Sequence, residues 1–196
     1  MEIMRLVVTG AVGAGKSTFV RSASEIKVVD VESRTTTQAS ALKDKFTIAL
    51  DYGRVNFNPN IAIHLYGTPG QVRFDFIWDL LIRRSHACIV LVAANRPGGF
   101  RNASRLLAFM EARVQIPLMI GITHTDCPGA WSMEDVTIAL GYAHQKRQPK
   151  MIRVNPNQKT SVVQALLTSV EQCNPTKALG CYNELPRTSL RYVWGF

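Results

Sequence analysis

The sequence lacks a long apolar run, and this absence excludes one class of protein. None of its apolar segments approaches the roughly 20 residues that a membrane-spanning helix needs. The first apolar run is short and leads directly into a glycine-rich loop, instead of following the basic residues of a signal peptide. We therefore expect a cytoplasmic protein, and its 196 residues suffice for one domain with a full core.

Cysteines with a recognisable spacing are missing as well. The four cysteines match neither a metal-binding nor a redox pattern, which is typical of reduced thiols in a cytoplasmic protein. His64 and His86 have no metal-binding residues grouped around them, so we expect both to be packed or hydrogen-bonded. The cysteines are Cys88, Cys127, Cys173 and Cys181.

Acidic residues are scarce, with 14 against 23 lysines and arginines, which leaves a net charge of +9. An excess of this kind can mark a surface for nucleic acid or for an acidic membrane. Here the basic residues are scattered, and the densest group, residues 146–153, has no aromatic side chains between them. We expect a solvated basic face and no nucleic-acid partner, and nothing in the sequence supports a membrane contact.

An apolar run followed by a glycine loop opens the chain. Residues 3–8 are expected to form a buried strand, and Gly10, Gly15, Lys16 and Ser17 follow in the order G-x-x-x-x-G-K-S. Between a strand and a helix this order predicts a phosphate-binding loop, because glycines let backbone N–H groups turn onto phosphate oxygens. The helix N-terminus and the lysine attract the same anion, and the serine hydroxyl is a Mg²⁺ ligand. The nucleotide is then also flanked by Val12, Gly13, Ala14 and Thr18.

Strand and helix signals alternate after this loop. Residues 46–57 and 61–66 flank a Pro/Asn turn, which predicts a hairpin, and the apolar run 87–93 is typical of a covered parallel strand. The polar stretch 26–44 is expected to be a long connection. Six strands with crossover helices predict a three-layer α/β fold with one antiparallel hairpin. The remaining elements are expected as strands at 3–8, 117–122 and 151–154 and as helices at 17–24, 74–84, 101–112, 132–140 and 161–172.

A second motif, Gly-Thr-Pro-Gly-Gln, follows the strand at 61–66. The hairpin pattern places Gly70 and Gln71 near the outer-phosphate end of the loop. A glycine N–H there can bond a γ-phosphate oxygen, and the glutamine amide can orient an attacking water. Phosphoryl transfer needs little more than such positioning and charge stabilisation. Alone the motif is a turn, but beside a phosphate loop it predicts a catalytic role.

Together these motifs resemble the bacterial Ras-like small GTPases. The likeness is carried by the glycine loop, by residues 50–53 with 65–71, by 73–78 and by 123–126, and it spans about residues 3–172. It is strongest to the predicted signalling GTPases related to the gliding-motility switch proteins and to the signal-recognition-particle receptor β-subunit. The resemblance implies a P-loop NTPase fold of the small G-protein type with six strands. It also implies a molecular switch that binds GTP with Mg²⁺ and hydrolyses it slowly to GDP.

The resemblance extends to domain organisation and partners. It implies a G domain over residues 1–173, with two switch segments at about 30–47 and 67–80 that respond to the γ-phosphate. An activating or effector protein, of the roadblock or longin type, is the implied partner. The remaining stretch, 174–196, is too apolar for a solvated tail, and we expect it to fold back on the domain rather than dock a partner or membrane.

Individual roles follow from matching positions. By resemblance, Thr47 is the first-switch threonine that binds Mg²⁺ and the γ-phosphate, with 35–37 as rival threonines. Gly70 is the second-switch glycine, and Gln71 is the water-positioning glutamine. Asp126 is the base-specificity aspartate, whose carboxylate accepts from the N–H groups of guanine that adenine lacks. It follows a strand at the edge where such folds bind ligands.

The base loops depart from the family pattern. Thr123 and His124 replace an Asn-Lys pair, so a hydroxyl stands where an amide braces the loop and an imidazole stands where a lysine stem covers the base. Pro156 lacks the backbone N–H that the family directs at guanine O6, and Asn157 is a candidate substitute. We expect these changes to weaken guanine selectivity.

The phosphate side departs as well. Gly67 stands where Ras proteins have a strand-end aspartate that holds a magnesium water, and Asp51 is a speculative helper. Val12 replaces a glycine beside the γ-phosphate, and its branched side chain predicts slow hydrolysis. Arg34 and Arg73 lie in the switch segments as candidate arginines in cis, although solvated loop arginines are the favoured interpretation for both.

Two other function classes stay open. A nucleotide-binding interaction module, or pseudo-GTPase, would bind nucleotide but hydrolyse little or none of it. Val12, Gly67 and the altered base loops favour this class, and Gln71 argues against it. The other class is a small ATP-using kinase, but no lid or acceptor-binding segment is evident, and Asp126 would be left unexplained.

Overall fold

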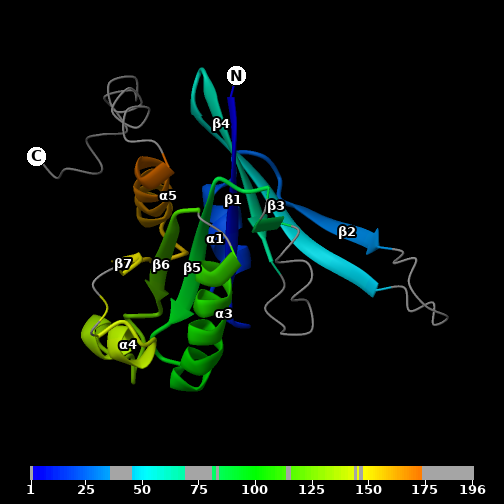
Figure 1. The fold of residues 1–196 in the computed structure, drawn as a ribbon. Helices are drawn as coiled ribbons and strands as arrows, with labels where there is room; N and C mark the ends of the chain where they lie inside the picture. The colour runs from blue at the N-terminus through cyan, green and yellow to red at the C-terminus, as the bar shows by residue number, and fades with distance from the viewer. Residues whose placement is uncertain are drawn as a thin grey trace, which may run out of the picture.

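The computed structural model describes residues 2–35, 46–68, 81–82, 84–113, 116–143, 145 and 148–173. In these residues seven strands form one sheet in the order β2-β3-β4-β1-β5-β6-β7 (Figure 1). The strands are β1 (Glu2–Gly10), β2 (Val29–Thr35), β3 (Phe46–Asn58), β4 (Ile61–Gly67), β5 (Ala87–Ala93), β6 (Leu118–Thr123) and β7 (Lys150–Arg153).

The sheet has a parallel part and an antiparallel edge. β1 lies between β4 and β5, and β5, β6 and β7 continue the parallel order. Every residue of β5 is buried, as expected for a parallel strand that is covered on both faces. β3 pairs antiparallel with β4 on one side and with β2 on the other.

Helices cover both faces of the sheet, which gives the fold its three layers (Figure 1). One core cluster joins Leu6 and Ile63 of the sheet to Phe19 of α1 (Lys16–Ala23) and Leu166 of α5 (Lys159–Cys173). The other cluster joins the opposite sheet face to α3 (Phe100–Arg113) and α4 (Met133–Ala139), with the short 3₁₀ helix η2 (Pro97–Gly99) before α3. Among the described residues no helix is long and apolar enough to cross a membrane.

The predicted fold class is confirmed, and all six predicted strands are present. The structure adds a seventh strand, because 29–35, expected to belong to a polar connection, pairs with β3 at the sheet edge. An edge strand needs only its backbone to pair, so its sequence can stay polar. Ser132 caps α4 as predicted, since its Oγ accepts from the Asp135 N–H at 3.1 Å. The predicted helix at 74–84 lies mostly outside the described residues, and 174–196 lies wholly outside them.

Candidate functional site

The glycine loop between β1 and α1 has the backbone of a phosphate-binding loop. Gly10, Gly13 and Gly15 all have positive φ, at 140°, 77° and 93°. A Cβ at Gly10 would collide with the carbonyl oxygen of Leu91, so only glycine lets the loop pass this close to β5. α1 begins directly after Gly15, and because the first N–H groups of a helix have no partner within it, they are available to an anion at the loop. The predicted strand–loop–helix arrangement is confirmed, and phosphate contacts by its individual residues stay a prediction.

Lys16 is buried at the mouth of the loop. Its Nζ donates to the carbonyl oxygens of Gly10 at 2.9 Å and Ala11 at 2.8 Å. Burial lowers the pKa of Lys16 to about 8, and the negative charge of Asp51 partly offsets this effect. At neutral pH the ammonium is therefore charged and held beside the loop, where an anion is its natural partner. Ser17 and Thr18 follow in the first turn of α1 and are half-buried.

Asp51 lies directly across a strand pair from Gly67. The two residues are partners in the antiparallel register of β3 and β4. A Cβ added at Gly67 would lie 3.0 Å from Asp51 Cβ and 3.3 Å from its Oδ2. The Asp51 carboxylate thus occupies the space that a side chain at position 67 would need. Asp51 of β3 thus places a carboxylate beside Gly67, at the end of the neighbouring strand β4.

Thr123 braces the loop from the end of β6. Its buried Oγ1 donates to the Ala14 carbonyl oxygen at 3.0 Å, and it lies 2.9 Å from His124 Nδ1. The replacement of an amide at this position therefore does not remove the brace, because the threonine hydroxyl makes the same kind of contact. Asp126 is exposed in the turn that follows β6.

The loop after β7 also contacts the glycine loop, at Gly15. A Cβ at Gly15 would lie 2.8 Å from Pro156 Cγ and 3.9 Å from His124 Cε1, so three segments meet there. Ser22 of α1 donates to the Pro156 carbonyl oxygen at 2.5 Å, which fixes the buried proline beneath the glycine loop. Asn157 is exposed, and its N–H donates to Asn155 Oδ1 at 3.0 Å.

Five other predicted site residues either lie on the β2–β3 pair or fall outside the described residues. Thr47 lies on β3 in the stretch 46–50, which pairs with β2 alone, and in Figure 1 the β2–β3 pair extends away from the rest of the sheet. Arg34 is the partner of Thr47 in that register. Gly70, Gln71 and Arg73 lie outside the described residues. The roles given to all five stay predictions.

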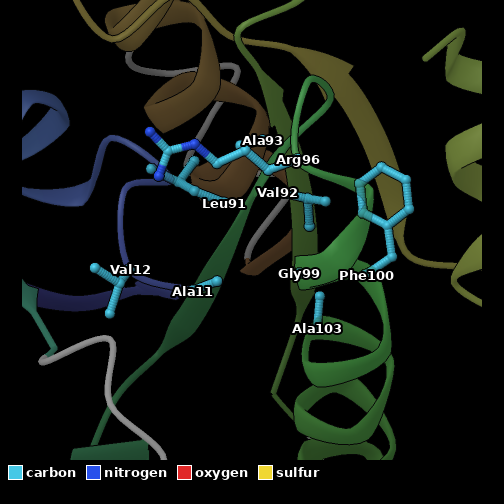
Figure 2. A pocket seen from close by; sticks show the side chains of 9 residues that line it. All are labelled: Ala11, Val12, Leu91, Val92, Ala93, Arg96, Gly99, Phe100 and Ala103. Atoms are coloured by element: carbon cyan, nitrogen blue, oxygen red, sulfur yellow. The ribbon is translucent and has the colours of Figure 1, made fainter. Parts of the chain in front are cut away.

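Val12 and Arg96 line a small cavity beside the loop. Its volume is about 130 Å³, and Phe100 and Ala103 of α3 close its other side (Figure 2). Val12 is 64% exposed, so its side chain projects from the loop into solvent. Arg96 was not among the residues predicted from sequence. Its place in the turn that follows β5, at the carboxyl edge of the parallel strands where α/β folds bind ligands, is the signal that would have found it.

The histidines and the buried cysteine have structural roles, as predicted. His86 Nδ1 accepts from the Arg5 N–H at 3.0 Å, and His64 Nδ1 lies 3.3 Å from the Tyr52 hydroxyl. Cys88 is a free, buried thiol, and burial raises its pKa to about 12. Within the part of the chain that the structure describes, no group of three or more His, Cys, Asp or Glu side chains could hold a metal ion.

Comparison with known proteins agrees with the fold. No family model matches the chain. It is 28% identical over 123 residues to an uncharacterised protein of Methanocaldococcus jannaschii, and the match covers 63% of this chain and 71% of that protein. It is also similar to the solved structure of the Arl6 BBS3 small GTPase of Trypanosoma brucei with a bound nucleotide analogue, GppNp. That similarity has a TM-score of 0.64 and 13% identity, and covers 89% of this chain and 99% of the other. The chain thus has the small-GTPase fold.

Proposed function

We propose that this protein is a guanine-nucleotide-binding switch that binds GTP and hydrolyses it slowly to GDP. The observation that carries the proposal is the meeting of three segments at the glycine loop. Thr123 and Pro156 both contact the loop, and Lys16 lies charged at its mouth. This arrangement suits a nucleoside phosphate whose phosphates lie in the loop and whose base lies between the 123–126 and 155–157 segments.

Guanine is the proposed base because Asp126 follows β6 at the carboxyl edge of the sheet. A carboxylate can accept from two N–H groups of guanine, whereas adenine has no such pair. Pro156 has no N–H to offer guanine O6, so Asn157, with its exposed side chain, is the proposed donor. We expect the preference for guanine over adenine to be smaller than in proteins with the full base motif.

Mg²⁺ fits the donor set of this site. Ser17 supplies a hydroxyl and Asp51 a carboxylate, and oxygen is the ligand atom that Mg²⁺ prefers. Thr47 is the third proposed ligand, by resemblance. When bound, the ion would neutralise charge on the phosphates. The scarcity of protein ligands agrees with the usual way that Mg²⁺ binds, with waters and phosphate oxygens completing its coordination.

Hydrolysis is assigned to the segment after β4. Gly70 would bond the γ-phosphate and Gln71 would position the attacking water. An activating or effector protein, proposed to be of the roadblock or longin type, would complete this arrangement.

Binding and turnover measured on one sample test this proposal. Nucleotide-stripped protein is titrated with GTP, GDP, ATP and ADP, and phosphate release is then followed. We expect guanine nucleotides to bind more tightly, with slow release that Gln71→Ala abolishes and Gln164→Ala, an exposed control on α5, leaves unchanged. Preference for adenine would overturn the assignment and favour the kinase class.

A second candidate function is a pseudo-GTPase. It is favoured by Val12, whose branched side chain stands 64% exposed on the loop where it can crowd a water-positioning group. Guanine binding without phosphate release, both alone and with candidate partners, would support this candidate over the switch.

A further inference from the structure

Arg96 lies at a fixed point beside the glycine loop. Its N–H donates to the Ala93 carbonyl oxygen at 3.1 Å, and its own carbonyl accepts from the Gly99 N–H at 2.9 Å. Pro97 follows it and limits the backbone further. The turn between β5 and α3 therefore holds the base of the arginine side chain in one place, at the same sheet edge as the loop.

The guanidinium reaches from this turn to the face of Gly13. A Cβ at Gly13 would collide with Arg96 Nη1, and it would lie 2.9 Å from Cζ and 3.4 Å from Nη2. Figure 2 shows the same side chain extending toward the loop that carries Ala11 and Val12. Glycine at position 13 thus leaves room for the planar group to approach the loop backbone.

No acceptor among the described residues explains this placement. Within the described residues, neither a hydrogen bond nor an ion pair joins the guanidinium of Arg96 to another side chain or carbonyl. The group nevertheless lies against Gly13, in the loop that precedes α1 and whose mouth holds the Lys16 ammonium. Like charges gathered around one loop repel each other unless an anion lies among them. Arg96 is exposed and therefore accessible to a ligand, and the two cations at this loop suit a bound anion.

We propose that Arg96 contacts the phosphates of the bound nucleotide from the Gly13 side of the loop. The inference rests on the proposed function and adds a second cation to Lys16, which lies on the Gly10 and Ala11 side. The middle of such a loop cradles the α- and β-phosphates, and the proposed contact is to the β-phosphate, which GDP and GTP share and GMP lacks. The guanidinium suits this role because its planar fork can bond two phosphate oxygens at once.

The assignment makes a specific prediction about nucleotide affinity. Arg96→Ala should weaken the binding of GDP and of GTP by the same factor, about tenfold, which is typical for the loss of one charge-assisted contact. GMP, which lacks the β-phosphate, should lose less. Any slowing of the hydrolysis of bound GTP should accompany this loss of GDP affinity, since the β-phosphate that Arg96 contacts is also part of the leaving group. Arg96→Lys, which keeps the charge but loses the fork, should be intermediate.

The experiment measures GDP, GTP and GMP affinity and single-turnover hydrolysis for the parent, both Arg96 variants and Arg105→Ala. Arg105 is an exposed arginine on α3 and serves as the matched control. Equal affinities for Arg96→Ala and Arg105→Ala would overturn the inference and leave the proposed function standing. An equal loss of GMP affinity would instead indicate a distorted loop, and a loss of hydrolysis alone would move the contact to the γ-phosphate; either result overturns it. A parent protein that binds no guanine nucleotide would overturn the proposed function itself, and the Arg96 inference with it.

Discussion

The two sides of the candidate site are built in opposite ways. On the side of the proposed base, two segments contact the glycine loop, through the Thr123 hydroxyl on Ala14 and through Pro156 against Gly15, and Ser22 of α1 in turn bonds Pro156. On the other side, residues 46–50 of β3 pair with β2 alone. A two-stranded ribbon without a third strand or a covering helix has little stability of its own.

The difference suits two separate roles, nucleotide binding on one side and response to the γ-phosphate on the other. A loop that the core already holds in place can bind a nucleotide with little loss of conformational entropy. A segment that responds to a γ-phosphate must instead be able to change position, and such segments belong to the least stable parts of a fold. The first-switch residues predicted here, about 30–47, include β2 and the start of β3 at this sheet edge.

The largest effect is expected from Lys16→Ala, which removes the cation from the rigid side. GDP and GTP affinity should fall about 100-fold, because a hydrogen-bonded charge at the phosphates is lost. Isothermal titration calorimetry measures this, with Lys159→Ala as an exposed control at the start of α5. Unchanged affinity would mean that the loop does not bind phosphate through Lys16.

The pKa of Lys16 predicts two opposite pH trends. Burial lowers that pKa to about 8, whereas an unfolded lysine titrates near its ordinary value of 10.5. Between these values the native protein has released the proton that the unfolded chain still binds, so the free energy of unfolding should rise with pH. Nucleotide affinity should fall in the same range, by up to about tenfold per pH unit, since binding must then take up a proton.

Both trends are measured between pH 7 and 10 by urea denaturation and by GDP titration. Each is compared with the Lys16→Met variant, which cannot titrate at this position. If the variant shows the same slopes as the parent, the lysine is not their source.

Thr123→Val tests the brace on the rigid side. The substitution leaves the buried Ala14 carbonyl without its donor, and we expect a loss of about 1–3 kcal/mol in the free energy of unfolding. Nucleotide affinity should fall several-fold as the loop loosens. Thr168→Val is the control, because the Thr168 hydroxyl bonds only the carbonyl of Gln164 within its own helix. Equal losses in the two variants would contradict a special role for Thr123.

The smallest effect concerns Asp51, where the two sides meet. Asp51→Asn should weaken the Mg²⁺ dependence of GTP affinity a few-fold and lower the pKa of Lys16 below about 8, because the carboxylate raises it. Glu134→Gln, an exposed change on α4, is the control. The double variant Asp51→Gly with Gly67→Asp returns the carboxylate across the strand pair and should restore the Mg²⁺ response. Failure of this exchange, with the fold intact, would contradict the assignment.

Much of the fold could be predicted from the sequence, because its signals are local. The order of glycines predicts the loop, and the apolar run 87–93 predicts the buried strand β5, each from a few neighbouring residues. Both structures are confirmed. β2 was not predicted, since an edge strand is selected by the backbone of its neighbour rather than by its own apolar pattern. In the candidate site, motifs pointed to the loop residues, Asp51 was named only as a speculative helper, and Arg96, which belongs to no motif, was missed.

The sequence by itself determined that a phosphate loop follows the first strand, with Lys16 and Ser17 at its end, because glycine order and helix dipole act within ten residues. Only the tertiary structure decided which distant side chains complete the site. The register of β3 against β4 places Asp51 in the space beside Gly67, and the turn after β5 brings Arg96 to Gly13. Both outcomes depend on distances between segments far apart in the chain, which are set when the sheet assembles and its core packs.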